Sequence, residues 1–243
     1  MNKLNRSMQS EEIVLVNEKD KIIGARDKFK VHLDGDLHRA FSILVFNPNG
    51  ELLIQKRNLN KYHSGGLWSN TCCSHQRCNE PLNKSIHRRL KEEMGFDCNL
   101  KEIFSFKYYI KFKNNLIENE LDHVFIGFFE GEPIGNKKEV AEFKWISLKN
   151  LRTDMVINPN LYSHWFKIMI RDYWGEISNS LNFQELFCCQ KNMYCGKCIK
   201  ESDGKNKISM DIESDGRRYI CPECGFSVDW NREKAKTLFS NHA

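Results

Sequence analysis

Residues 68–75 read Trp68-Ser69-Asn70-Thr71-Cys72-Cys73-Ser74-His75, and a charged amphipathic run from Glu80 to Gly95 follows them. Side chains two residues apart in an extended strand point to the same face. Cys73, a candidate nucleophile or proton donor, and His75, a candidate metal ligand, are therefore expected on the same side. We expect the other chemically important residues, upstream and downstream, to lie close to this segment and to the helix after it.

That helix is predicted over residues 81–94. Pro81 suits the first turn, and Gly95 stands where a C-cap belongs. Ile86 and Leu90 fall on one apolar face.

Outward from this helix, β-rich runs alternate with turn residues. We expect hairpins at 11–24 and 40–56, strands at 100–113, 124–129 and 139–146, and a second helix at 161–174. Read alone, the basic segment that leads to His32 and His38 is a solvated loop with two incidental histidines. Strands interleaved with few helices are typical of an α/β or α+β domain, with a mixed sheet packed between helices.

The composition is that of an ordinary globular protein, with 40% hydrophobic and 28% charged residues among 243. The net charge of +5 favours an anionic ligand, but the lysines are scattered, which disfavours nucleic acid. Residues 1–12 lack the apolar stretch of a signal peptide, and no apolar run is long enough for a bilayer. Ten cysteines without a secretion signal indicate reduced thiols, metal ligands or catalytic groups. We therefore expect a cytoplasmic protein without a membrane partner.

Two acidic residues, Glu92 and Glu93, close the predicted helix just before Gly95. Carboxylates at a helix C-terminus oppose the macrodipole, which is a slight local cost. Such a local inconsistency is expected where a carboxylate is kept for Mg²⁺ and phosphate oxygens. The pattern resembles a degenerate Nudix box in which Arg89 replaces the first glutamate. Loss of that glutamate argues against ordinary diphosphate hydrolysis.

A second acidic pair, Glu118 and Glu120, has the spacing that places both carboxylates on one side of a strand. Their mutual repulsion costs stability unless a cation or a shared proton compensates, although an exposed acidic turn explains the pair equally well. With His32, His38 and His75 the pair makes three imidazoles and two carboxylates. That set suits Mn²⁺ or Zn²⁺ better than Ca²⁺.

Taken together, five separated motifs resemble type I isopentenyl-diphosphate Δ-isomerase, a Nudix-fold branch that isomerises rather than hydrolyses. They run collinearly between Glu11 and Trp174: His32…His38-Arg39-Ala40-Phe41-Ser42, the stretch 68–75, Arg88-Arg89-x-x-Glu92-Glu93-x-Gly95, Glu118-Asn119-Glu120 and Trp165. The resemblance implies a Nudix fold and a divalent-metal-dependent isomerase of isoprenoid biosynthesis. Its substrate would be isopentenyl diphosphate and its product dimethylallyl diphosphate.

The resemblance also implies which residues hold metal and substrate. The Mn²⁺ or Zn²⁺ ion would be bound by His32, His38, His75, Glu118 and Glu120. Glu93 would serve Mg²⁺, which bridges to the substrate diphosphate. The diphosphate would be bound by the basic residues Lys28, Arg57, Lys61 and Arg89.

The same resemblance implies the catalytic residues. Cys73 would be the catalytic cysteine, with Cys72 pointing the other way. Tyr108 would hydrogen-bond Glu120, and Trp165 would face a tertiary carbocation. An unactivated alkene is a very weak base, so its proton donor must be positioned and desolvated. Cys73 and Glu120 would form the proton-transfer pair, with either one as the donor. Without the family, Trp165 reads as a core aromatic of an amphipathic helix.

A second, small domain is expected at residues 181–243, after a first domain at 1–180. It carries two Cys-x-x-Cys pairs, Cys195/Cys198 and Cys221/Cys224, which predict a zinc ribbon with a closed four-thiolate site. Such a small segment needs its structural Zn²⁺ to fold. Its basic residues leave a protein or nucleic-acid contact surface open as an alternative: Lys200, Lys205, Lys207, Arg217 and Arg218.

Two other functions fit parts of the sequence. One is a Nudix diphosphate hydrolase, which Arg89 and the presence of Cys73 with Glu120 disfavour. The other is a regulator that senses an isoprenoid diphosphate and contacts nucleic acid or protein through the ribbon. A sensor has no need to retain Cys73.

Overall fold

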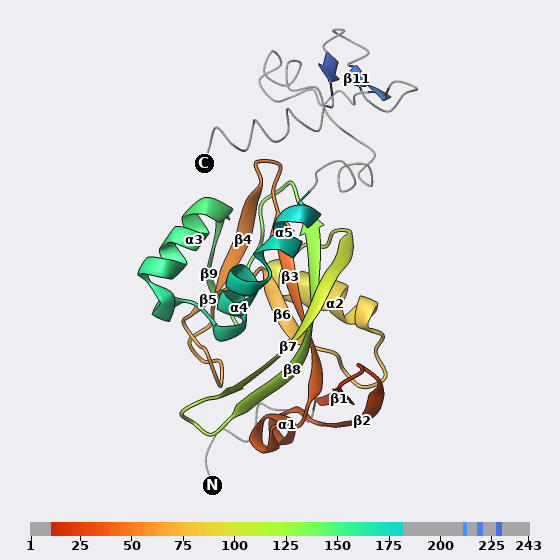
Figure 1. Ribbon diagram of the computed structural model, residues 1–243, viewed down its shortest axis with the longest axis vertical. Helices are drawn as coiled ribbons and strands as arrows, with labels where there is room; N and C mark the ends of the chain where they lie inside the picture. The colour runs from red at the N-terminus through yellow and green to blue at the C-terminus, as the bar shows by residue number, and fades with distance from the viewer. Residues whose placement is uncertain (1–10, 182–210, 213–217, 221–226, 230–243) are drawn as a thin grey trace. The chain divides into compact units, whose positions relative to one another are not determined.

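The structure is a computed structural model that describes residues 11–181 and three short strands at 211–212, 218–220 and 227–229. The chain divides into two compact units, Met1–Leu181 and Asn182–Ala243. Figure 1 labels the helices and strands of the first unit and strand β11 of the second.

The first unit is built on a nine-stranded sheet. Its strands are β1 Glu12–Val16, β2 Ile22–Asp27, β3 His38–Phe46, β4 Glu51–Arg57, β5 Trp68–Ser69, β6 Cys72–His75, β7 Leu100–Lys111, β8 Ile117–Phe128 and β9 Val140–Ser147. Strand β3 pairs antiparallel with β1, β4 and β6 and parallel with β8. The sheet is therefore mixed, as the sequence predicts.

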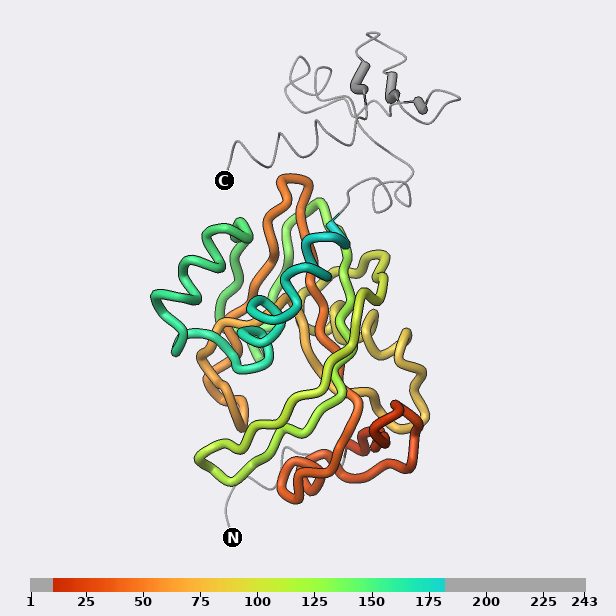
Figure 2. The backbone as a smooth tube through the Cα atoms, viewed as in Figure 1, coloured from red at the N-terminus to blue at the C-terminus, as the bar shows by residue number. Residues whose placement is uncertain are grey.

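Helices cover this sheet on both sides. They are α1 Lys28–Asp34, α2 Leu82–Met94, α3 Leu148–Ile157, the short 3₁₀ helix η2 Pro159–Leu161, α4 His164–Asp172 and α5 Trp174–Ser180. Figures 1 and 2 show α4 and α5 in front of the central strands and α2 behind them. The apolar stripe of α2, with Ile86 and Leu90, packs in one buried cluster with Phe41 and Ile43 of β3. A sheet between helices confirms the α+β prediction.

Residues 28–34 form helix α1, so the expectation of a solvated loop before His38 is wrong. The Asp27 side chain accepts a hydrogen bond from the Lys30 amide at 3.0 Å and so caps the first turn. Gly35 ends the helix with a left-handed φ of 76°. Asp27 and Gly35 are typical of the two ends of a helix, but the basic residues between them favoured the prediction of a solvated loop.

Other element boundaries also differ from the prediction. Helix α2 begins at Leu82 with Pro81 as its N-cap, and the helix expected at 161–174 is two helices that meet at Tyr173. Helix α3 was not predicted, because it buries only Leu151 and Met155 and so lacks a strong apolar stripe.

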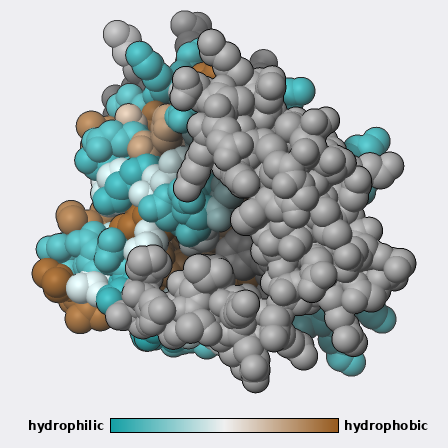
Figure 3. Space-filling view, turned by 90° about the horizontal axis from the view of Figure 1, so that it is seen from above, coloured by the Kyte–Doolittle hydropathy of each residue, from teal (hydrophilic) through white to brown (hydrophobic). Residues whose placement is uncertain are grey.

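Hydrophilic residues make up much of the coloured surface in Figure 3, with apolar groups in patches. Among the exposed apolar side chains are Val156 and Ile157 at the end of α3. Within the described part of the chain, no helix has the length and apolar character needed to span a membrane.

The described part of the second unit is a three-stranded antiparallel sheet. It consists of β10 Asp211–Ile212, β11 Arg218–Ile220 and β12 Ser227–Asp229. The four cysteines of the predicted zinc ribbon, Cys195, Cys198, Cys221 and Cys224, lie outside the described residues.

Candidate active site

Strand β6 separates its two cysteines onto opposite faces. Its antiparallel pairing with β3 sets Cys73 opposite Ser42 and His75 opposite Ala40. Cys73 and His75 line a cavity, whereas Cys72 is fully buried in the apolar core behind the sheet. The alternation expected for an extended segment is what places a thiol and an imidazole in one cavity.

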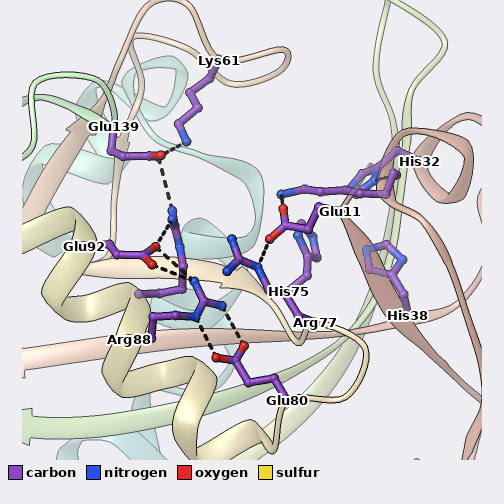
Figure 4. A network of polar contacts seen from close by, with 12 residues as sticks. Glu11, His32, His38, Lys61, His75, Arg77, Glu80, Arg88, Glu92 and Glu139 are labelled. Atoms are coloured by element: carbon purple, nitrogen blue, oxygen red, sulfur yellow. Dashed lines mark hydrogen bonds and ion pairs between the residues drawn. The ribbon is translucent and has the colours of Figure 1, made fainter. Parts of the chain in front are cut away.

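Three histidines and two glutamates meet beside this cavity. His32 comes from α1, His38 from the first position of β3 and His75 from β6, while Glu118 and Glu120 come from β8. One ligand atom from each lies within 4.8 Å of all the others, and all five residues are buried. The parallel β3–β8 register sets His38 directly opposite Glu120. Figure 4 shows the three histidines beside a network of charged residues.

The hydrogen bonds of this cluster fit a divalent metal ion. The Nδ1 atoms of His32 and His38 donate to the backbone oxygens of Lys28 and Asp36, at 2.6 and 2.9 Å. Those bonds fix the tautomer and leave each Nε2 as a lone-pair donor, the usual arrangement of a metal-binding histidine. Neither Nε2 atom has a hydrogen-bond partner among residues 11–181, and neither does Glu118 Oε2. Unpartnered buried nitrogen and oxygen atoms of this kind are costly unless a cation occupies the space between them.

Four basic side chains line the same cavity: Lys28, Arg57, Lys61 and Arg89. Lys28 and Arg57 belong to α1 and the end of β4, and Lys61 belongs to the connection from β4 to β5. Lys61 and Arg89 are both ion-paired with Glu139, and Figure 4 shows the contact between Lys61 and Glu139. The cavity therefore combines a carboxylate–imidazole cluster with positive charge suited to an anionic ligand.

Glu93 lies apart from the five-residue cluster. It is 4% exposed, accepts a hydrogen bond from Gln55 Nε2 at 2.7 Å, and is ion-paired with Arg89 one turn earlier in α2. Arg89 also contacts Glu92, which is more exposed. The acidic end of the Nudix-like helix is thus neutralised by the arginine that replaces the usual glutamate.

Burial raises the pKa of the Cys73 thiol to about 12, although the nearby Arg57 guanidinium acts in the opposite direction. Arg57 Nη1 donates to Cys73 Sγ at 3.5 Å. A thiol with this pKa keeps its proton at neutral pH. Cys73 is therefore protonated at neutral pH and has a proton to donate.

Tyr108 and Trp165 complete the wall around these groups. The Tyr108 hydroxyl donates to Glu120 Oε2 at 2.6 Å, and burial raises the pKa of Tyr108 well above its usual value, so it remains a donor. Trp165 Nε1 donates to Asn70 Oδ1 at 3.1 Å, which fixes the indole. The Arg57 guanidinium lies 5.2 Å from the centre of the Trp165 ring.

Ten of the predicted site residues line this cavity: Lys28, Arg57, Lys61, Cys73, His75, Arg89, Tyr108, Glu118, Glu120 and Trp165. His32 and His38 belong to the five-residue cluster beside it, and Glu93 lies apart. Several other residues of the cavity were not predicted. Asp122, buried and bonded to Ser42 at 2.8 Å, extends the alternation that Glu118 and Glu120 begin, and this spacing was the available signal. Tyr62 and His63 also line the cavity. They lie in a loop without periodicity, where the sequence carries no comparable signal.

Comparison with known proteins gives consistent matches. Residues 36–166 match the NUDIX domain family model. The chain is 50% identical over 174 residues to isopentenyl-diphosphate Delta-isomerase 2 of Photorhabdus laumondii, covering 72% of this chain and 94% of the relative. It is 47% identical over 160 residues to the isopentenyl-diphosphate Delta-isomerase of Burkholderia multivorans, covering 66% of this chain and 91% of the relative.

A solved structure supports the fold. A protein from Deinococcus radiodurans superposes with a TM-score of 0.56 at 17% sequence identity, covering 66% of this chain and 98% of that protein. The family model and the two relatives confirm the family resemblance expected from the sequence for the first unit. The chain belongs to the isopentenyl-diphosphate Δ-isomerase family of Nudix-fold enzymes.

Proposed function

We propose that the first unit interconverts isopentenyl diphosphate and dimethylallyl diphosphate by proton transfer through a tertiary carbocation. In this reaction a proton is added to the terminal alkene carbon, and another proton is removed from the methylene on the other side of the cation. The observation that carries the proposal is one cavity lined by Cys73, Glu120, Tyr108 and Trp165 together with four basic side chains.

Cys73 and Glu120 form the proposed proton-transfer pair. The raised pKa of Cys73 supports the thiol as the group that starts with a proton. Glu120 accepts the Tyr108 hydroxyl on one oxygen and contacts His75 on the other, at 2.8 Å. These contacts orient the carboxylate for removing a proton from the cation.

The diphosphate is assigned to Lys28, Arg57, Lys61 and Arg89. Lys61 and Arg89 now share Glu139 as a counter-ion, so an incoming diphosphate competes with one carboxylate for two cations. Charge-assisted hydrogen bonds from arginine to phosphate oxygens are strong and geometrically specific.

A divalent cation, Mn²⁺ or Zn²⁺, is assigned to His32, His38, His75, Glu118 and Glu120. When bound, it would stabilise the buried carboxylates in their charged form. A second ion, Mg²⁺, is assigned to Glu93 and the diphosphate, which requires Arg89 to exchange its contact with Glu93 for the phosphate oxygens.

The indole of Trp165 is assigned to the carbocation. A cation over a tryptophan face is stabilised by roughly 2 kcal/mol when it is desolvated. Exclusion of water matters equally, because water would capture the cation as an alcohol.

Hydrolysis is not favoured. In this chain Arg89 occupies the box position of a metal-binding glutamate, and its guanidinium pairs with Glu93. A pure sensor is less consistent with a buried, protonated Cys73 opposite a fixed carboxylate. We also propose a cytoplasmic location, where the thiol of Cys73 would be kept reduced.

The deciding experiment is NMR of the full chain with isopentenyl diphosphate and Mg²⁺ in heavy water. Dimethylallyl diphosphate carrying deuterium is the expected product. Release of phosphate or a monophosphate would identify a hydrolase. Unchanged substrate, with metal bound and Cys73 reduced, would favour the sensor.

A further inference from the structure

A fourth histidine, His63, lies against the proposed metal site and has no role in the function described above. It belongs to the connection between β4 and β5 and is 8% exposed. Its Nε2 atom lies 2.5 Å from Glu118 Oε1. Its ring stacks on Phe112, with centroids 4.9 Å apart and planes 16° apart, and meets Trp165 edge-on at 6.0 Å.

The two oxygens of Glu118 have different surroundings. Oε1 is approached by His63 at 2.5 Å and by His32 at the longer distance of 3.6 Å. Oε2 is buried and has no hydrogen-bond partner in the described residues. One oxygen is thus held by a ring nitrogen while the other remains available as a ligand. Carboxylates that bind metal ions are commonly held by an outer hydrogen bond of this kind.

The position of His63 separates it from the ligands themselves. The His32 ring centroid is 4.9 Å from those of His38 and His75, but 6.1 Å from that of His63. On its other side, His63 Nδ1 lies 3.4 Å from Ser64 Oγ, which suits a hydroxyl donating to that nitrogen. In this tautomer the proton is on Nε2, facing Glu118.

We propose that His63 is a positioning residue: it holds Glu118 in its metal-binding orientation by donating from Nε2 to Oε1. This role rests on the metal site assigned to His32, His38, His75, Glu118 and Glu120 under the proposed function.

His63 also lies in the loop that carries Lys61, one of the four basic residues assigned to the diphosphate. Next to His63, the Tyr62 ring packs edge-on against His32 at 5.6 Å, and the Tyr62 carbonyl accepts from Asn114 Nδ2 at 3.0 Å. Lys61 directly precedes this pair. The segment that carries Lys61 is thus connected to the metal site through Tyr62 and His63.

The test is a titration of the metal-free full chain with Mn²⁺, with free Mn²⁺ followed by electron paramagnetic resonance. Mn²⁺ prefers oxygen and imidazole ligands over thiolates, so it reports on the histidine–glutamate site rather than on the cysteine pairs. We expect His63→Phe, which keeps a flat ring but lacks the donor, to weaken Mn²⁺ binding about 10–100-fold. We expect His63→Gln, whose amide can donate from a similar position, to restore most of the affinity.

Phe112→Leu is the matched control, because it removes the stacking partner of His63 and leaves its nitrogen in place. We expect its Mn²⁺ affinity to stay close to that of the unchanged chain. Excess Mn²⁺ should restore turnover of His63→Phe, an effect that a purely structural defect would not show. Thermal unfolding of the metal-free variants checks that each is folded.

Equal Mn²⁺ affinity in His63→Phe and the unchanged chain would overturn this role while leaving the proposed function intact. Equal losses in His63→Phe and His63→Gln would also overturn it, since the donor would then be irrelevant. If the unchanged chain itself bound no Mn²⁺, the metal site and the role of His63 would both be wrong.

Discussion

Cys72 and Cys73 are neighbours in the chain with opposite surroundings. Cys72 is fully buried among apolar side chains, whereas Cys73 lines the cavity beside Arg57. Because the two side chains leave opposite faces of β6, only one of them can reach a substrate. This contrast allows the role of the thiol to be tested with its neighbour as the control.

We expect Cys73→Ala to lower kcat for isomerisation by at least about 10²-fold, the usual loss for a missing proton-transfer group. Binding of isopentenyl diphosphate should be nearly unchanged, because the basic residues remain. Turnover by NMR and binding by calorimetry measure the two effects. Cys72→Ala should keep its turnover per folded molecule and lose stability, about 1 kcal/mol, through a small core cavity. Near-normal turnover of Cys73→Ala would remove the thiol from the mechanism.

The pH dependence of Cys73 follows from its raised pKa of about 12. An ordinary thiol ionises at a pKa of about 8.5, so at pH 9 Cys73 should react with iodoacetamide on the order of 10³-fold more slowly than a free cysteine peptide. Its reaction rate should still be rising at pH 11. Because the folded-state pKa is higher than the unfolded one, its stabilising contribution is complete below about pH 8.5 and declines as the pH rises toward 12. Mass spectrometry of the Cys73 peptide gives the rate, and a plateau near pH 9 would contradict the assignment.

At the scale of elements, helix α2 shows how a Nudix-like helix is retained without its first glutamate. Arg88 donates to Glu80 at 2.7 and 2.8 Å and contacts Glu92 at 3.1 Å, so it ties the loop before the helix to its last turn (Figure 4). The hydrogen bonds from Arg88 lower the pKa of Glu80 to about 2. This pairing and that of Arg89 with Glu93 offset the cost of acidic residues near the helix C-terminus.

The end of α2 provides a stability prediction. Gly95 has a φ of 77°, and an added Cβ would lie 2.8 Å from the backbone oxygen of Ile134. We expect Gly95→Ala to lower the free energy of unfolding by about 1–3 kcal/mol, because alanine is strained at positive φ and the clash is with backbone. Urea denaturation measures the change.

The matched control is Gly175→Ala in α5, where an added Cβ meets nothing within 4 Å. That change should leave stability unaltered or raise it by up to about 1 kcal/mol, since alanine favours the helix. Equal effects of the two substitutions would show that the left-handed backbone at Gly95 is not the cause of the lower free energy of unfolding.

At the scale of the whole molecule, the family relationship accounts for the first unit alone. The alignment of 174 residues covers 94% of the Photorhabdus laumondii relative, which leaves that protein no room for a second unit as large as Asn182–Ala243. We propose that the second unit is a structural zinc ribbon that serves a protein contact, and that catalysis does not depend on it.

We expect removal of residues 191–243 to leave isomerase turnover per folded chain largely unchanged, because every residue assigned to the cavity lies in the first unit. The NMR assay measures this. Complete loss of turnover with a folded first unit would show that the second unit is part of the active enzyme.

The zinc site itself is tested by metal analysis of the full chain after dialysis. Four thiolates predict one tightly held Zn²⁺, and Cys221→Ser with Cys224→Ser should release it. Retention of the same zinc content by that variant would rule out the ribbon.

The sequence alone determined those features of this protein that depend on local geometry. The two-residue spacing of Cys73 with His75, and of Glu118 with Glu120, follows from strand periodicity, and the order of motifs was sufficient to predict the family and the mixed sheet. Which residues from distant parts of the chain lie next to these pairs depends on the tertiary structure. The parallel register of β3 and β8 sets His38 opposite Glu120 across about eighty residues of chain, and no local pattern encodes that register. The tertiary structure also decided that His63, in a loop without periodicity, lies against Glu118, because that contact depends on how the loop folds back onto β8.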